Sequence, residues 1–390
     1  MVRAGHRPYP GRVLTPSTAV VIDREGLSAI LRALVDDGRT LHGPTTDGDA
    51  IVIDTLRDVD DLPAGVGDEQ APARYRLRRR EDDALFGYAV PAQGWKRVLY
   101  PPRTELVRIR RKDDALTVET PPSPAARKAF IGVRPCELAA IAVQDRVLTG
   151  GAHADADYRA RRADVFVLAV HCGAPAETCF CASMGTGPRA EAGFDLAATE
   201  LIDARGHRFV VEVGSEHGRA ILARAPAHPP TDDDLEAARA VTDRAAAAQT
   251  RALPPDTRTA LASVLDHPHW HDVAARCLGC ASCTMACPTC FCTTVEDTTD
   301  LTGELATRTR RWDSCLTGEY AYVHGGSSRP SLRARYRQWL THKLMNWHEQ
   351  FGTSGCTGCG RCITWCPAGI DLTREVAALT APAPAPASRS

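Results

Sequence analysis

Eight cysteines in two matching patterns constrain this chain more than any other feature of its sequence. Each pattern reads C-x2-C-x2-C-x3-C-P, first over residues 277–288 and again over residues 356–367. Bacterial ferredoxins bind [4Fe–4S] clusters with this spacing, because three thiolates two residues apart can wrap a short loop around one cubane. Gly279, Gly358 and Gly360 allow positive φ angles, which turn backbone amides toward the sulfides.

The fourth cysteine of each pattern is predicted to bind the cluster of the other pattern, as in two-cluster ferredoxins. The first predicted ligand set comprises Cys277, Cys280, Cys283 and Cys366. The second comprises Cys356, Cys359, Cys362 and Cys287. Structural zinc is the alternative, but zinc sites pair C-x2-C knuckles across a long spacer. Iron–sulfur clusters therefore fit this spacing better.

Seven of the 15 cysteines lie outside these patterns, and four of the seven precede them. Cys136 and Cys172 each follow a predicted strand, and Cys136 also begins a predicted helix. The free N–H groups and positive end of a helix stabilise a thiolate or an anionic cluster. We therefore predict a third [4Fe–4S] cluster, with inert buried thiols as the alternative. Its ligands would be Cys136, Cys172, Cys179 and Cys181.

Cys290, Cys292 and Cys315 have no firm role in this scheme. Three cysteines could hold a cluster only with a fourth group, such as one of the histidines at 267, 269 and 271. We interpret the three cysteines as residues that pack beside the clusters, and the histidines as structural.

The distribution of cysteines also divides the chain. We predict an α/β domain for residues 1–255 and a largely α-helical, ferredoxin-like two-cluster domain for residues 256–375, with an insert at 293–350. The fold class is thus mixed α and β, because apolar strand candidates alternate with helical patterns. The strand candidates are 19–22, 51–53, 75–79, 106–110, 130–133, 165–170 and 209–213, and the helix candidates are 27–35, 137–148 and 232–253.

Two further segments carry expectations. A helix over residues 331–350 places Leu332, Tyr336, Trp339, Leu340, Lys343 and Trp347 near one face, which we expect to cover the clusters and exclude water. Residues 376–390 are predicted to form a disordered tail, because they end in Ala-Pro repeats.

Charge and composition exclude several classes of function. The chain has 390 residues, with 47 basic and 48 acidic side chains, so no basic excess would attract nucleic acid. The longest apolar run, residues 165–170, is far shorter than the ~20 residues of a membrane span. With no secretory signal either, we expect a cytoplasmic protein, whose thiols stay reduced. No G-x-G-x-x-G fingerprint follows a strand and no C-x-x-C-H motif occurs, so we expect no NAD, flavin or haem on this chain.

Several segments occur in one characteristic order: residues 132–138, residues 179–181, the first pattern continued to Cys292, residues 311–315, and the second pattern. In this respect the chain resembles the β subunit of cytoplasmic, multimeric [NiFe] hydrogenases of the sulfhydrogenase type. The corresponding subunit of anaerobic sulfite reductase is similar. The resemblance implies an iron–sulfur relay within an oxidoreductase complex, with no catalytic residue on the chain itself.

The same resemblance implies partners. A γ subunit would bind flavin and NAD(P), a small δ subunit would carry further clusters, and a large α subunit would hold the nickel–iron site. Two other functions remain open from the residues alone: the corresponding subunit of an anaerobic sulfite reductase, and a stand-alone sulfur or polysulfide reductase.

Overall fold

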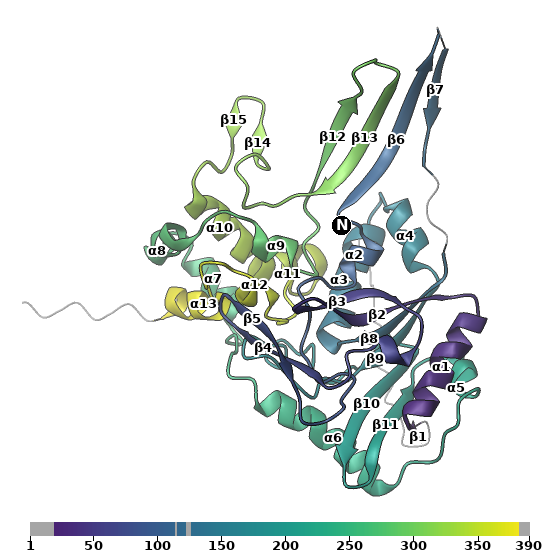
Figure 1. The fold of residues 1–390 in the computed structure, drawn as a ribbon. Helices are drawn as coiled ribbons and strands as arrows, with labels where there is room; N and C mark the ends of the chain where they lie inside the picture. The colour runs from purple at the N-terminus through teal and green to yellow at the C-terminus, as the bar shows by residue number, and fades with distance from the viewer. Residues whose placement is uncertain (1–18, 114, 122–125, 382–390) are drawn as a thin grey trace, which may run out of the picture.

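The computed structural model describes residues 19–113, 115–121 and 126–381 (Figure 1). Its strands are β1 (Ala19–Ile22), β2 (Thr40–Asp47), β3 (Ala50–Leu56), β4 (Val66–Ala71), β5 (Arg74–Arg79), β6 (Arg103–Lys112), β7 (Ala115–Glu119), β8 (Lys128–Val133), β9 (Val165–Val170), β10 (Leu196–Asp203), β11 (Gly206–Val213), β12 (Thr293–Thr299), β13 (Leu305–Trp312), β14 (Tyr322–Val323) and β15 (Gly326–Ser327).

The α-helices are α1 (Arg24–Asp36), α2 (Lys96–Leu99), α3 (Pro135–Thr149), α4 (Ala156–Arg162), α5 (Glu216–Leu222), α6 (Asp232–Ala247), α7 (Thr257–Ser263), α8 (His269–Arg276), α9 (Ser282–Met285), α10 (Leu332–Thr341), α11 (Trp347–Phe351), α12 (Arg361–Thr364) and α13 (Leu372–Thr380). A 3₁₀ turn spans Val59–Asp61, and a π-helical turn spans His342–Asn346.

A seven-stranded mixed sheet forms the centre of the amino-terminal segment, in the order β1-β11-β10-β9-β8-β2-β3. The strands β10, β9, β8 and β2 pair in parallel, and the remaining pairs are antiparallel. Every residue of β8 is buried, as expected for a parallel strand covered on both faces. These observations confirm the predicted mixed α/β class.

Helices cover both faces of this sheet. On β9, Phe166, Leu168 and Val170 pack in one core with α1 and α5, which lie side by side in Figure 1. The alternate residues Val167 and Ala169 pack with α3 on the opposite face. This alternation follows from the two-residue period of a strand. Helix α6 covers the α3 face farther along, over β10 and β11.

The four-stranded sheet β12-β13-β6-β7 projects from the body of the molecule as an arm (Figure 1). It combines two strands from before residue 255 with two from after it, so the two predicted segments share an element. The insert at 293–350 was predicted to contribute a helix, but its first half forms β12 and β13. Sequence reasoning missed this pairing because β6 and β13 lie about two hundred residues apart.

Three predicted helices have different bounds in the structure. Helix α6 ends at Ala247 rather than at 253, and the side chain of Gln249 beyond it bonds to Cys181 and Ala182. The helix predicted over 331–350 is α10, the π-helical turn and α11 in succession. Helix α13 runs to Thr380, into the predicted tail, because Val376 and Leu379 are fully buried. Residues 382–390 of that tail lie outside the described part of the chain.

The helices from α7 to α13 surround a second core, distinct from that of the large sheet. Its largest buried side chains include Trp270, Tyr336 and Trp339, and cysteines of both patterns pack against it. Within the described ranges, no helix is both long enough and apolar enough to cross a membrane.

Candidate metal centres

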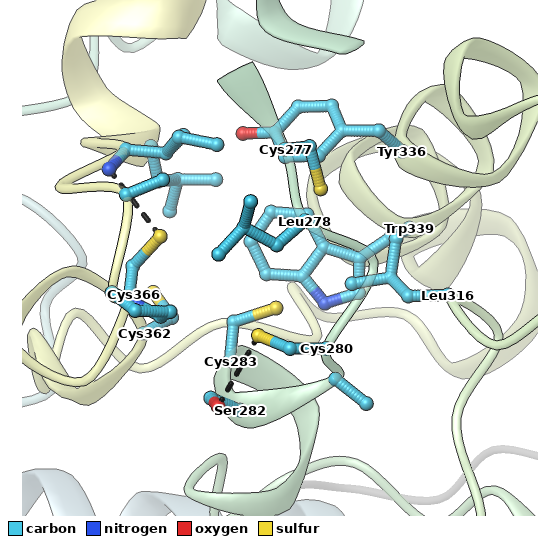
Figure 2. A pocket seen from close by; sticks show the side chains of 15 residues that line it. Cys277, Leu278, Cys280, Ser282, Cys283, Leu316, Tyr336, Trp339, Cys362 and Cys366 are labelled. Atoms are coloured by element: carbon cyan, nitrogen blue, oxygen red, sulfur yellow. Dashed lines mark hydrogen bonds between the residues drawn. The ribbon is translucent and has the colours of Figure 1, made fainter. Parts of the chain in front are cut away.

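The first predicted ligand set lines one cavity (Figure 2). Cys277 ends α8, Cys283 lies in α9, and Cys366 follows α12, so three short helices bring these sulfurs together. Cys280 completes the set, and Cys362 of the second set also borders the cavity. Burial raises the pKa of Cys277 and Cys283, as does the charge of the neighbouring Cys366 thiolate.

Apolar side chains enclose this cavity. Tyr336 and Trp339 of α10 line it together with Leu316, and all three are nearly inaccessible to solvent. They lie against the cysteines in Figure 2, on the helix that was predicted to cover the clusters. Cys280 is the exception, because it is exposed and its neighbour Leu278 is 67% exposed. The cavity is therefore dry on the α10 side and open at Cys280.

The two cysteine loops repeat one backbone geometry. The N–H groups of Gly279 and Gly358 each donate to the sulfur of the cysteine two residues earlier, both at 3.5 Å. Both glycines have positive φ angles, 63° and 64°. Ala281 and Gly360 occupy the next equivalent positions, also left-handed, with φ angles of 66° and 76°. The amides thus point at sulfur, as the spacing predicted.

The second set is brought together around a buried lysine. Charges on Cys359 and Cys287 act on the Cys356 thiol, whose burial first of all raises its pKa to about 12. The ammonium of Lys343 lies 3.1 Å from the sulfur of Cys287 and 3.4 Å from the carbonyl oxygen of Gly355. A hydrogen bond from Cys290 and the charge of Lys343 lower the pKa of Cys287. Cys287 is thus a stabilised thiolate next to the loop of the other pattern.

The amino-terminal four cysteines line a single cavity. Cys136 lies at the start of α3 and Cys172 directly follows β9. Because β8 and β9 are neighbouring parallel strands, their carboxyl ends meet at one sheet edge, the usual position of a site in such sheets. Cys179 and Cys181 reach the cavity from the following loop, and Gln249 donates to the sulfur of Cys181 at 3.3 Å.

Two buried arginines flank this amino-terminal cavity. Arg134 donates to the carbonyl oxygens of Phe86 and Tyr88, at 2.6 and 2.7 Å. Burial opposes its charge, but the Cys172 thiolate raises the pKa of Arg134. Arg361 donates to Glu137 at 2.5 Å, and burial is again outweighed because the charges of Glu137, Cys359 and Cys136 raise its pKa.

Each of these guanidinium groups keeps one buried nitrogen without a hydrogen-bond partner among the described residues: Nε of Arg134 and Nη1 of Arg361. Both side chains are at most 2% exposed. A buried cation with an unused donor is costly unless an anion lies nearby. A four-thiolate [4Fe–4S] cluster is an anion, so this cavity fits the predicted group better than it fits inert thiols.

The second and third cysteine sets are in direct contact. Cys359 packs against Cys136 and Cys181, and the N–H of Phe180 donates to the carbonyl oxygen of Gly358 at 2.9 Å. A Cβ atom on Gly358 would lie 2.6 Å from the backbone nitrogen of Cys181. The absence of a side chain at 358 therefore allows the amino-terminal loop to lie on the second ferredoxin-type loop.

The remaining three cysteines also lie near this region. Cys290 is hydrogen-bonded to Cys287, and its sulfur lies 3.5 Å from the ammonium of Lys343. Cys292 and Cys315 are hydrogen-bonded to each other. Of the neighbouring histidines, His269 bonds Glu375 at 2.7 Å. In the part of the chain that the structure describes, no group of three or more His, Cys, Asp or Glu side chains is arranged to hold a single metal ion.

Comparison with known proteins agrees with this arrangement. Residues 276–370 match the family model of the 4Fe-4S dicluster domain. Over 290 residues, the chain is 31% identical to sulfhydrogenase 2 subunit beta of Pyrococcus furiosus, an alignment that covers 71% of this chain and 82% of the relative. The chain belongs to the family of sulfhydrogenase β subunits. Membership of this family and the dicluster domain together identify an iron–sulfur electron-transfer subunit of an oxidoreductase, as the resemblance implied.

Sequence reasoning missed the charged residues around the cysteines of this β subunit. Lys343 was assigned only to a covering stripe, although a lysine among Leu and Trp at helical spacing is itself a signal of a buried charge. Arg134 and Glu137 flank Cys136 in sequence, and Arg361 lies next to Cys362. A charged residue beside a predicted ligand, in an otherwise apolar segment, is the pattern that could have identified these three.

Proposed function

We propose that this chain holds three [4Fe–4S] clusters and relays electrons between a hydrogenase module and a flavin- and NAD(P)-binding subunit. Its ligands are the three predicted sets: Cys277, Cys280, Cys283 and Cys366; Cys356, Cys359, Cys362 and Cys287; and Cys136, Cys172, Cys179 and Cys181. When bound, each cluster takes up and releases one electron at a time. The protein supplies position, burial and N–H···S hydrogen bonds, which tune the potential.

The observation that carries this proposal is the contiguity of the three sets. Cys359 of the second set contacts the third set through Cys136 and Cys181, and Cys362 of the second set borders the cavity of the first. The second set therefore lies between the other two. The exposed Cys280 marks one end of this row, and the half-buried Cys172 marks the other. We infer an electron path that runs through the second set in either direction.

The buried charges support anionic groups at these positions. Arg134, Arg361 and Lys343 are nearly inaccessible to solvent, and each adjoins a cysteine of the second or third set. Three buried cations beside thiols would be unfavourable if the thiols were protonated and unliganded. Thiolate ligands of clusters would balance them.

The projecting arm supports the presence of partner subunits. Ile109 pairs directly with Val118, and Leu116 follows on the same face of β7; the latter two are each 68% exposed. Contiguous exposed apolar residues are typical of a surface that another protein covers. We propose that a neighbouring subunit of the complex binds this face, and that the γ, δ and α subunits implied by the resemblance assemble on the chain in the cytoplasm.

Iron and acid-labile sulfide per chain test the proposed clusters. We expect about twelve irons in the wild-type chain, and about eight in Cys136→Ser, because a [4Fe–4S] cluster contributes four. About eight irons in both proteins would contradict the third cluster. Zinc in place of iron would contradict all three.

The partners are tested by co-purification from native cells. We expect nickel and flavin in the assembled complex; sirohaem instead would indicate a sulfite reductase, and full activity of the isolated chain would indicate a stand-alone enzyme. Val118→Asp should reduce recovery of partners without lowering iron content. Thr117→Asp, on the opposite face of β7, is its matched control.

A further inference from the structure

Cys292 and Cys315 lie together at the base of the arm. Cys292 directly precedes β12, and Cys315 follows the end of β13. The last pair of the ladder joins Thr293 to Trp312, and the N–H of Asp313 then donates to the carbonyl oxygen of Cys292 at 2.8 Å. The two cysteines are therefore held side by side by the strand pairing, although 22 residues separate them in sequence.

The sulfur of Cys292 accepts three hydrogen bonds. The donors are the S–H and the backbone N–H of Cys315 and the phenolic O–H of Tyr320. The S–H bond from Cys315 is the main reason that the pKa of Cys292 falls to about 6, and the same bond raises the pKa of Cys315. At neutral pH the pair is thus one thiolate and one thiol in contact, the form in which a disulfide is made and broken.

This pair lies between the first two cysteine sets but belongs to neither. Cys315 feels the charge of Cys283 in the first set. On the other side, Cys292 adjoins Cys290, which is hydrogen-bonded to Cys287 of the second set. Both Cys292 and Cys315 are partly exposed, so protons can reach bulk water.

We propose that Cys292 and Cys315 form a redox-active dithiol that exchanges two electrons with the two ferredoxin-type clusters. On oxidation, the Sγ–Sγ bond forms between the Cys292 thiolate and Cys315. The S–H bond of Cys315 breaks, one proton leaves for solvent, and two electrons pass, one to each oxidised cluster. Reduction reverses each step. The pair would store two electrons beside carriers that each hold one, and this role depends on the relay proposed above.

Thiol mapping of the iron-replete chain tests the pair. Samples poised at oxidising and reducing potentials are denatured in an alkylating reagent, and their peptides are analysed by mass spectrometry. We expect a peptide linking Cys292 to Cys315 only after oxidation, and two alkylated cysteines after reduction. Alkylation of both residues at every potential would overturn the proposal.

Electron counting gives a second measurement. Reductive titration of the wild-type chain should consume about two electrons more than titration of Cys292→Ser or Cys315→Ser. Cys290→Ser, which removes a neighbouring thiol outside the pair, should match the wild type. Equal electron counts in all four proteins would overturn the dithiol, as would a loss of about four irons in Cys292→Ser, which would make Cys292 a cluster ligand.

Iron content in the same samples tests the relay separately. A chain that lacks iron but still forms the disulfide would overturn the proposed function. An iron-replete chain that never forms it would overturn the dithiol alone.

Discussion

Arg361 donates to Glu137 at 2.5 Å in the interior of the protein, and so links the second ferredoxin-type loop to the start of α3. The two residues are 0% and 2% exposed. Glu137 also accepts a hydrogen bond from Trp95 at 3.1 Å. Residues that are more than two hundred positions apart in sequence thus form one charged connection between the second and third cysteine sets.

Removing the guanidinium should destabilise the protein strongly. We expect Arg361→Met to lower the free energy of unfolding by about 3–5 kcal/mol, because it leaves Glu137 buried and unpaired. The control is Arg308→Met, whose partner Asp297 is 64% exposed in its side chain. That change should cost about 1 kcal/mol or less. Thermal unfolding of the iron-replete proteins at one scan rate makes the comparison, and equal midpoints for Arg361→Met and wild type would contradict it.

Lys343 should raise the reduction potential of the second cluster. Its ammonium contacts the Cys287 sulfur, and a nearby positive charge favours the reduced, more negative cluster. We expect Lys343→Met to lower that potential by on the order of 100 mV, from the Coulomb energy of one charge at about 6 Å in an effective dielectric of about 20.

A redox titration followed by electron paramagnetic resonance measures this potential. Lys343→Arg keeps the charge and should retain most of it. An unchanged potential in Lys343→Met, with iron content intact, would exclude this electrostatic role.

Gly360 should be far less tolerant of alanine than its counterpart in the first loop. A Cβ atom at 360 would lie 2.5 Å from the carbonyl oxygen of Thr178, and the φ angle is left-handed as well. We expect Gly360→Ala to cost more than about 2 kcal/mol and to lower iron content through the second and third clusters. Ala281→Gly, at the equivalent position, should leave stability unchanged or raise it by about 1 kcal/mol. Equal behaviour of the two loops would contradict the close approach at Gly360.

His42 should make the protein less stable as the pH falls. Burial lowers the pKa of His42 below its usual value near 6.5, and the charge of Lys128 adds to this, while Asp54 acts in the opposite direction. The unfolded chain therefore binds more protons, so stability is complete above about pH 6.5 and declines below it.

Thermal unfolding between pH 8 and 5.5 measures this decline. His42→Gln should flatten it, whereas substitution of the exposed His228 should not. An unchanged slope in His42→Gln would show that other groups are responsible.

The short-range features of this fold were open to prediction from sequence. Strand β9 is a buried apolar run, and Cys136 was correctly placed at a helix start after β8 because both features are local. The cysteine spacing likewise indicated the dicluster domain that the family model matches. What could not be predicted depends on distant pairing. Neither β6 with β13 nor Arg361 with Glu137 has a periodic signature, since each partner is a charged or ordinary residue in its own segment.

The contact between Phe180 and Gly358 also bears on how the protein is made. The ribosome releases the α/β segment first, and the loop that ends in Cys181 is then ready before the second ferredoxin-type loop exists. Because Gly358 and Gly360 lie against that loop, the carboxy-terminal loop is shaped on a surface that is already folded. Maturation therefore has a direction: a truncated carboxy-terminal half, expressed alone, would lack the template on which its own cofactor loop is moulded.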